Sequence, residues 1–531
     1  MKDIEHLQAK TKEEIIALFQ EVLQNNQTNL DNLTEVNQTQ TQKIESLRAQ
    51  VNTLQHQLKQ AVQSRYGKKS EKLSQDHPQQ LLFDEAQAPE AIKVVEKENE
   101  EITIATYTRK KTGRKPLPKE LPRKQVIHDL PEAEKICECG CTLTHIADDK
   151  SEQLEIIPAQ VYVIENIKKK YACKACELTI KTAKQTAQII PKSIATASLL
   201  AHVAVAKIDD HLPLYRQEEI FKRSGIDIPR ASLSLWMIRI GEAIQPLINL
   251  MQDNINDYDI VYADETPVQV LNEKNRKATQ KSYMWLFIGG SPEKRSYYYH
   301  YAQTRASGVP YQILDDFKGY LHCDGYSGYL SLFTTKPIKG VGCMAHARRK
   351  FVEITKVVKE KGLAHEAINI IAKLYAIEKQ IKENQYSSNE IKAYRAEHAQ
   401  PILDEFKQWL LTHKTKVPPS FPIGKAIAYT LKQWPYLINY IEDGRLEIDN
   451  NLSERGIKPF VIGRKNWMFM GNEHGARATT NLFSLIETAK AHQLNPFAYL
   501  RYVFEKLPLA NTLEDYERLM PYNCQHLKQT A

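Results

Sequence analysis

The stretch YDIVYADETPVQVL, residues 258–271, decides how the rest of the chain is interpreted. Its first half is apolar and β-branched, with Ile260, Val261 and Ala263, and so predicts a buried strand. Two adjacent carboxylates, Asp264 and Glu265, follow directly, at what we expect to be the end of that strand. A turn would account for two acids in this place. The segments that follow favour another explanation, in which Asp264 is half of a metal-binding pair.

Three further β-rich segments and one helix follow in a definite order. After the first strand come residues 282–290 and 295–302, then a short helix at 307–317, and then a strand at 319–324. Three antiparallel strands, a helix and a strand beside the first form the opening of a ribonuclease-H-like fold. The last strand ends in Asp324 as the first ends in Asp264. Pairing these two strands would therefore bring both carboxylates to one end of the sheet.

A third acid follows a long helical stretch. Helix-like patterning covers residues 352–440 and predicts a helical insertion, after which the chain returns with Asp449, Asn450 and Asn451. These residues are natural helix caps, and Glu454 falls in the first turns of the helix that they would start. Glu454 is therefore either a surface acid that offsets the helix dipole or a third metal ligand.

Three carboxylates suit a pair of Mg²⁺ ions, with Mn²⁺ as the alternative. Mg²⁺ prefers hard oxygen ligands and keeps several waters. Two such ions about 3.5–4 Å apart can activate an attacking hydroxyl and stabilise the leaving oxygen of a phosphodiester. We assign the bridging role to Asp264 and the flanking positions to Asp324 and Glu454.

The composition is that of a globular protein with several domains. The chain has 531 residues, of which 26% are charged and 42% hydrophobic, and its net charge is +8. The length predicts several domains rather than one. No apolar run approaches the ~20 residues needed to cross a bilayer, and the charged start lacks the apolar core of a signal peptide. We expect a cytoplasmic, nucleoid-associated protein with no membrane partner.

A basic block lies at residues 104–124, where eight Lys or Arg accompany one Glu. Because this block also contains Gly and Pro, it cannot bury a core of its own, and its charge suits a polyanion such as DNA. A solvated linker is the other interpretation. The predicted DNA contacts in this block are Arg109, Lys110, Lys111, Arg114 and Lys115.

Residues 30–66 have the pattern of a helix with an apolar seam. Seam positions recur alternately three and four residues apart, as in a coiled coil. Asn37 and Gln40 interrupt the seam, as polar residues do where register must be specified. This pattern predicts a homo-oligomer formed through the helix, or else packing of the helix against the chain's own body.

Five of the eight cysteines lie within residues 137–176, in a chain without an export signal. Such crowding favours a metal site over a disulfide framework. Cys173 and Cys176 have the spacing of two thiolate ligands of one tetrahedral ion, and two of Cys137, Cys139 and Cys141 would complete a four-thiolate site for one structural Zn²⁺. The alternating strands between the two halves predict a zinc-ribbon-like segment.

Residues 182–252 are helical in pattern and contain a candidate helix-turn-helix. An amphipathic helix is followed by a Ser-Gly-Ile turn and a second helix that opens near Pro229 or Ser232. Arg230 would then lie at the start of a recognition helix that enters a major groove. An ordinary helical hairpin fits the same pattern.

At these motifs the chain resembles bacterial transposases of the insertion-sequence-66 family, a group with a DDE catalytic triad. The resemblance covers nearly the whole chain. It is carried by RYGKKSEKL, LLFDE, GRKPLP, the cysteine segment, HLPLYRQEEIFKRSGI, YADETPVQVL, HCDGYSGY, CMAHARRKF, IDNNLSERGIKPFVIGRKNWMF and SLIETAK. One departure concerns the upstream cysteines, which in the family are commonly C-x-x-C, whereas here they alternate.

The resemblance implies roles for several residues. Asp264, Asp324 and Glu454 would form the triad, with the helical insertion before the last acid, and accessory proteins of the same element would be partners. Within CMAHARRKF, we interpret Arg348 and Arg349 as phosphate contacts. After the last acid, cationic phosphate contacts and a stacking indole are expected at Arg455, Lys458, Arg464, Lys465 and Trp467, although Trp467 also fits a core position.

We therefore expect a multidomain α+β protein with a ribonuclease-H-like catalytic domain that contains a helical insertion. The expected regions are a coiled-coil oligomerisation region at 1–75, an acidic then basic linker at 76–125, a zinc-binding domain at 126–181, a helix-turn-helix-like region at 182–255, the first part of the catalytic core at 256–351, the insertion at 352–440, the second part of the core at 441–505 and a C-terminal tail at 506–531.

The leading hypothesis is a Mg²⁺-dependent transposase that binds the terminal inverted repeats of its element and joins the cut ends to target DNA. A zinc-dependent DNA-binding regulator without catalytic activity is one alternative. A structure-specific, metal-dependent nuclease is the other.

Overall fold

The computed structural model describes residues 16–17, 23–28, 40, 43, 161–172, 180–183, 186–357 and 362–528. The predicted seam of residues 30–66, apart from residues 40 and 43, the basic block and the five crowded cysteines lie outside these ranges. The chain divides into two compact units, one formed by Met1–Lys68 with Thr186–Ala531 and the other by Lys69–Gln185. In the second unit, β1 (Lys170–Ala172) pairs antiparallel with β2 (Ile180–Thr182), on either side of the segment that contains Cys173 and Cys176.

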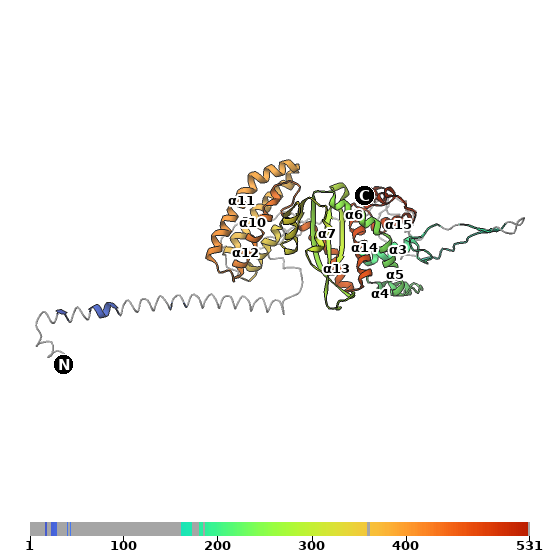
Figure 1. The fold of residues 1–531 in the computed structure, drawn as a ribbon, viewed down its shortest axis with the longest axis horizontal. Helices are drawn as coiled ribbons and strands as arrows, with labels where there is room; N and C mark the ends of the chain where they lie inside the picture. The colour runs from blue at the N-terminus through green and yellow to red at the C-terminus, as the bar shows by residue number, and fades with distance from the viewer. Residues whose placement is uncertain are drawn as a thin grey trace, which may run out of the picture. The chain divides into compact units, whose positions relative to one another are not determined.

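A mixed sheet forms the centre of the first unit (Figure 1). Its strand order is β5-β4-β3-β6-β7, and β8 also pairs with β3. β4 runs antiparallel to both β3 and β5, whereas β6 runs parallel to β3 and β7. The order predicted for the first four strands is therefore confirmed. The strands are β3 (Ile260–Asn272), β4 (Lys281–Gly289), β5 (Ser296–Ala302), β6 (Gly319–His322), β7 (Ile338–Val341) and β8 (Met470–Asn472).

The predicted helical region before the sheet is also helical in the structure. It contains α3 (Ala197–Ile208), α4 (Leu214–Arg223), α5 (Arg230–Ala243) and α6 (Gln245–Asn256). The turn between α4 and α5 contains Gly225 at φ +78°, a left-handed conformation that glycine adopts without strain. Pro229 is the N-cap of α5, at the place where the second helix of the candidate helix-turn-helix is expected to open.

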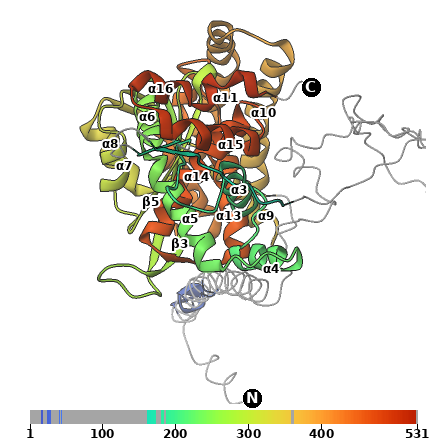
Figure 2. The same ribbon diagram turned by 90° about the vertical axis from the view of Figure 1, so that its right-hand side faces the viewer.

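One long helix joins these helices to the sheet. α14 (Glu473–Ala491) packs against α3, α5 and α15 (Pro496–Lys506) and against β5 (Figure 2). Gly241 permits the close approach of α5, because a Cβ there would lie 2.4 Å from the Cβ of Ala478. The hydroxyls of Thr488 and Ser484 accept hydrogen bonds from backbone N–H groups of the edge strand β5. α14 thus satisfies donors that an uncovered strand edge would expose.

A second group of helices lies mostly within residues 352–440, the stretch for which an insertion is predicted, although its first helix begins before that stretch. α9 (Met344–Thr355), α10 (Leu363–Asn384), α11 (Ser388–Lys416) and α12 (Pro422–Leu437) pack on one another, and α12 also contacts β7. α10, α11 and α12 lie on one side of the sheet in Figure 1, and α3 and α5 on the other. A buried ion pair between Arg395 and Glu378, 2.7 Å apart, joins α11 to α10.

The last described residues, in the region expected to be a C-terminal tail, pack on the body of the protein. They include α16 (Leu513–Arg518) and several short turns, and Met520 and Cys524 are fully buried. Two short helices remain among the described residues, α7 (Gly308–Ile313) and α8 (Leu330–Thr335), together with the longer α13 (Asn451–Trp467), which lies on β3 and β4. Within the described ranges, no helix is both long and apolar enough to cross a membrane.

Candidate active site

The strand that carries Asp264 does not end there, contrary to the expectation from sequence. β3 continues to Asn272 because β4 pairs with it as far as Gln269, and β8 pairs with it at Val270 and Asn272. What ends is the pairing with β6, whose last partner on β3 is Tyr262, opposite His322. Asp264 therefore lies just past the point where β6 separates from β3, while β4 remains paired with β3 there.

Asp324 lies two residues after the end of β6, the strand next to β3. Tyr262 and His322 are register partners, and their rings stack with centroids 5.0 Å apart. Because side chains alternate between the faces of a strand, Asp264 lies on that same face of β3, and Asp324 follows two residues after β6 ends at His322. Asp324 Oδ1 accepts a hydrogen bond of 2.9 Å from the backbone N–H of Tyr326, which orients its carboxylate.

Glu454 reaches the same place through contacts at the start of α13. Asn450 Nδ2 donates to the carbonyl of Ala263 at 2.9 Å, and Ser453 Oγ donates to the same carbonyl at 3.4 Å. Both residues are therefore attached to the residue that precedes Asp264. Asn450 occupies the N-cap position, but its side chain forms this tether and not the predicted capping bond.

Two side chains of helix α9, those of His346 and Arg349, lie beside the third acid, Glu454. The Glu454 carboxylate lies 3.5 Å from His346 Nδ1 and 3.6 Å from Arg349 Nη2. Despite these neighbours, Glu454 Oε1 is buried without a hydrogen-bond partner among the described residues. The two α9 side chains thus hold the carboxylate near Asp264 while leaving one of its oxygens available.

The pKa of Asp264 reflects its burial and the acids near it. Burial first, and then the nearby negative charges of Glu265, Asp324 and Glu454, together raise the pKa of Asp264 to about 8. Asp324 and Glu454 therefore lie near enough to Asp264 for their charges to affect its pKa. Carboxylates that are this poorly compensated favour a bound cation, which would remove both the repulsion and the cost of burying the charge.

The donor set fits a hard divalent cation. Asp264, Asp324 and Glu454 offer only carboxylate oxygens, the ligands that Mg²⁺ and Mn²⁺ prefer, and the unpartnered oxygen of Glu454 is free to bind one. Within the described ranges, the one group of three possible ligands whose atoms all lie within 4.8 Å of one another is Cys343, His346 and Glu454, which includes the third acid. Burial raises the pKa of the Cys343 thiol to about 12, which opposes the thiolate that a metal would need.

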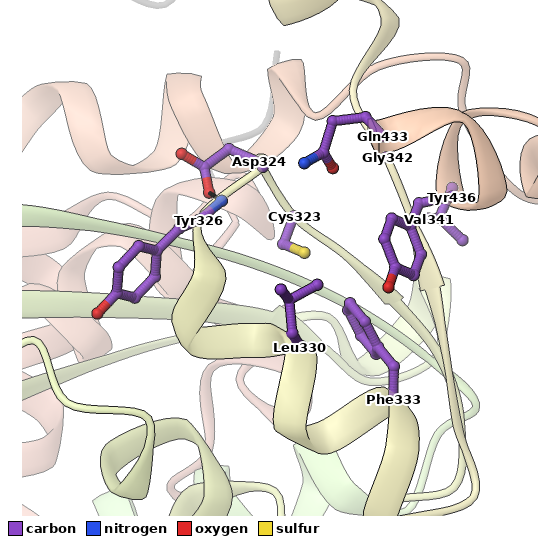
Figure 3. A pocket seen from close by; sticks show the side chains of 10 residues that line it. Cys323, Asp324, Tyr326, Leu330, Phe333, Val341, Gly342, Gln433 and Tyr436 are labelled. Atoms are coloured by element: carbon purple, nitrogen blue, oxygen red, sulfur yellow. Dashed lines mark hydrogen bonds between the residues drawn. The ribbon is translucent and has the colours of Figure 1, made fainter. Parts of the chain in front are cut away.

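A small pocket beside Asp324 connects the site to the inserted helices (Figure 3). Gly325 has no room for a side chain, because a Cβ there would lie 2.7 Å from the hydroxyl of Tyr429 and 2.9 Å from Gln433 Nε2, both on α12. α12 thus packs directly on the turn that carries Asp324. The pocket is lined by Cys323, Asp324, Gly325, Tyr326, Leu330, Phe333, Val341, Gly342, Gln433 and Tyr436.

Comparison with known protein families shows to which family the chain belongs. Residues 192–478 match the family model described as "Transposase IS66 family", which spans the sheet, the inserted helices and all three acids. The chain belongs to the IS66 transposase family. Three further models of this group match along the chain. They are the "zinc-finger binding domain of transposase IS66" at 134–177, the "IS66 C-terminal element" at 484–522 and "Transposase C of IS166 homeodomain" at 53–126.

Relatives in Sinorhizobium fredii (strain NBRC 101917 / NGR234) cover most of the chain. Uncharacterized protein y4jD is 34% identical over 77% of this chain and 81% of its own length. Uncharacterized protein y4qI is 29% identical over 88% of both chains. The similarity of this IS66 family member to these proteins is thus not confined to one domain.

Several predicted DNA contacts of the IS66 protein are exposed in the structure. Arg230 is exposed at the start of α5, and Arg455, Lys458 and Lys465 are exposed on α13. Arg349 has a side chain that is 52% exposed. These exposed positions are compatible with phosphate contacts.

Three other predicted contacts have structural roles. Arg348 is only 4% exposed, so the phosphate contact predicted for it does not fit its position. Arg464 donates to Thr266 Oγ1 and to the Pro267 carbonyl, which attaches α13 to β3 just beyond Asp264. Trp467 is partly buried against Phe460, with ring centroids 5.4 Å apart, and thus fits the core alternative better than a stacking platform.

One group of residues near Asp264 could not be recognised from the sequence. Glu265, the second acid of the opening stretch, is bound by Arg305 and by the hydroxyl of Tyr329. Arg305 comes from the loop after β5, far from Glu265 in sequence, and its stretch has no motif that would single it out. Only the fold brings these residues to the site.

Proposed function

We propose that this IS66 family member is a metal-dependent transposase that cuts the ends of its element and joins them to target DNA. The observation that carries the proposal is that Asp324 and Glu454 lie near enough to Asp264 to raise its pKa, beside the point where β6 separates from β3. Membership of a transposase family supports the same reaction class. The zinc-finger match supports zinc and DNA as partners.

Asp264, Asp324 and Glu454 would hold the metal, with Asp264 in the bridging role. When bound, a pair of Mg²⁺ or Mn²⁺ ions would activate the attacking water or 3′-hydroxyl and stabilise the leaving oxygen. The chain's own residues orient the ligands. The Tyr326 N–H orients Asp324, the tether from Asn450 to Ala263 positions the start of α13, and His346 and Arg349 hold Glu454 from α9.

Binding of DNA would depend on parts of the chain outside this centre. The zinc-finger region, with Cys173, Cys176 and two upstream cysteines as ligands of one Zn²⁺, and the α4–α5 pair would recognise the inverted repeats. Exposed cations near the third acid, namely Arg349, Arg455 and Lys458, would contact phosphates. Self-association through the N-terminal seam and a requirement for accessory proteins belong to the same proposal.

The test is cleavage and joining of a duplex that carries one end of the element, with Mg²⁺ and the full-length protein. Asp264→Asn should lower cleavage by about three orders of magnitude or more, because metal ligands act together, while binding to the duplex persists. Asp316→Asn is the matched control, since Asp316 is an exposed acid that precedes β6. Unchanged cleavage by Asp264→Asn would refute the proposed triad.

The same assay separates the alternatives. A DNA-binding regulator would bind the duplex without cutting it, and has no need for three converging acids. A structure-specific nuclease would cut but would not join the cut 3′ end to a second duplex. Joined product that depends on all three acids supports transposition alone.

A further inference from the structure

The second acid of the opening stretch, Glu265, is not available as a metal ligand. Its side chain is 1% exposed, and both of its oxygens are occupied. Oε1 accepts hydrogen bonds from Nε and Nη2 of Arg305, and Oε2 accepts one of 2.6 Å from the hydroxyl of Tyr329. Because neighbouring side chains on a strand point to opposite faces, Glu265 points away from the face of Asp264. Glu265 therefore has a role other than metal binding.

Arg305 is held in place at both its side chain and its backbone. Its guanidinium is bound to Glu265 on one edge and lies over the ring of Tyr326, 3.8 Å from the centroid. The hydroxyl of Tyr326 in turn donates to the backbone carbonyl of Arg305. An arginine on a surface ordinarily keeps much of its rotamer freedom, whereas this one has lost it before any ligand binds.

This ordered cation is next to the triad and open to solvent. Tyr326, which carries the guanidinium on its ring, is also the residue whose backbone N–H binds Asp324. The side chain of Arg305 remains 40% exposed, and its Nη1 has no hydrogen-bond partner within the described ranges. A planar guanidinium with free N–H groups is well suited to a phosphate oxygen.

The negative charge of the three acids explains why a cation such as Arg305 would be needed at this site. Asp264, Asp324 and Glu454 make the centre strongly negative, and a DNA backbone that approaches it must be attracted by fixed positive charge. We propose that Arg305 contacts a DNA phosphate next to the scissile position and that Glu265 is the positioning residue that holds it there. This inference rests on the proposed function, since it places DNA at this centre.

Measurement of salt-dependent binding tests the inference without any cleavage. The affinity for a duplex carrying one element end is measured against salt concentration in Ca²⁺, where hydrolysis is suppressed. Each lost phosphate contact lowers the slope of log K against log salt by about 0.9. Arg305→Ala should therefore lower the slope by about 0.9. Arg445→Ala should not, although Arg445 is similarly exposed (35%) and is also paired with carboxylates, near the start of β3.

Variants of Glu265 test the positioning role. Glu265→Gln should lower the affinity for DNA, and combining it with Arg305→Ala should give no further change in slope, because both act through one contact. If Arg305→Ala does not fold, as judged by its melting temperature, Arg305→Gln replaces it with the same expected loss of slope, since it too lacks the charge.

The result that would overturn the inference is a wild-type slope in Arg305→Ala or Arg305→Gln, whatever happens to the melting temperature. In that case the guanidinium only neutralises Glu265. Because binding is measured without hydrolysis, failure of the inference differs from failure of the proposed function. The latter would appear as unchanged cleavage in Asp264→Asn.

Discussion

The rings of Tyr262 and His322 stack almost parallel across two neighbouring strands, with an interplanar angle of 8°. This contact lies two residues before Asp264 and Asp324, and so it sets the alignment of the two acids. His322 Nε2 also donates to the carbonyl of Glu447 at 2.7 Å, in the segment that leads to Asn450 and Glu454. One buried imidazole thus connects the chain segments that carry all three acids.

Two substitutions of His322 should separate its two contributions to stability, the stacking on Tyr262 and the hydrogen bond to the Glu447 carbonyl. His322→Phe keeps a ring on Tyr262 but leaves the Glu447 carbonyl unpaired, for which we expect a loss of about 1–3 kcal/mol in the free energy of unfolding. His322→Ala removes the ring as well and should cost about 3–5 kcal/mol. Urea unfolding of the two variants measures the difference. Equal stability of the two would contradict a stabilising role for the stacked pair.

The tether between Asn450 and Ala263 should matter more for cleavage than for DNA binding. Asn450→Ala removes a buried hydrogen bond and should cost about 1–2 kcal/mol of stability. It should also lower the cleavage rate by displacing Glu454. Asn451→Ala is the matched control, because the side chain of Asn451 makes no hydrogen bond among the described residues. Similar cleavage rates in the two variants would argue against the tether.

Two cations of α13 should behave in opposite ways. Arg464→Ala breaks the attachment of α13 to Thr266 and Pro267, so it should lower the melting temperature and leave the salt dependence of DNA binding unchanged. Lys458→Ala should lower the slope of that salt dependence by about 0.9 and leave the melting temperature unchanged. Melting curves and binding isotherms at several salt concentrations measure both effects. The reverse pattern would show that the assigned roles are wrong.

The cysteine segment should bind one zinc ion per chain. Cys173→Ser and Cys176→Ser should each abolish it, because each removes one of four thiolates. Among serine variants of Cys137, Cys139 and Cys141, two should lose the ion and one should keep it. Metal analysis of the purified variants gives the answer. A wild-type protein without stoichiometric zinc would rule out the site.

Much of the sheet could be predicted from sequence because its strands are patterned by burial. Ile260, Val261 and Ala263 are all buried, as their apolar character indicates. The length of β3 could not be predicted in this way, since the residues after Asp264 are held in the strand by hydrogen bonds to β4. Those partners lie in a separate segment of the chain, so the sequence next to Asp264 does not indicate the pairing.

The site was predictable in its acids but not in what supports them. Asp264, Asp324 and Glu454 each stand beside a recognisable strand or helix start, so spacing and resemblance could identify them. The tether of Asn450 and the binding of Glu265 by Arg305 join residues that are 187 and 40 positions apart. Capping preference correctly located the start of α13, but tertiary contact determined what the Asn450 side chain does.

The most direct test of the shared metal centre is Mn²⁺ binding, followed by electron paramagnetic resonance in zinc-saturated protein bound to an element end. The wild type should bind Mn²⁺, and Asp264→Asn, Asp324→Asn and Glu454→Gln should each lose bound ion, whereas Asp316→Asn should match the wild type. If all three variants bind as much Mn²⁺ as the wild type, these carboxylates do not form a common metal site.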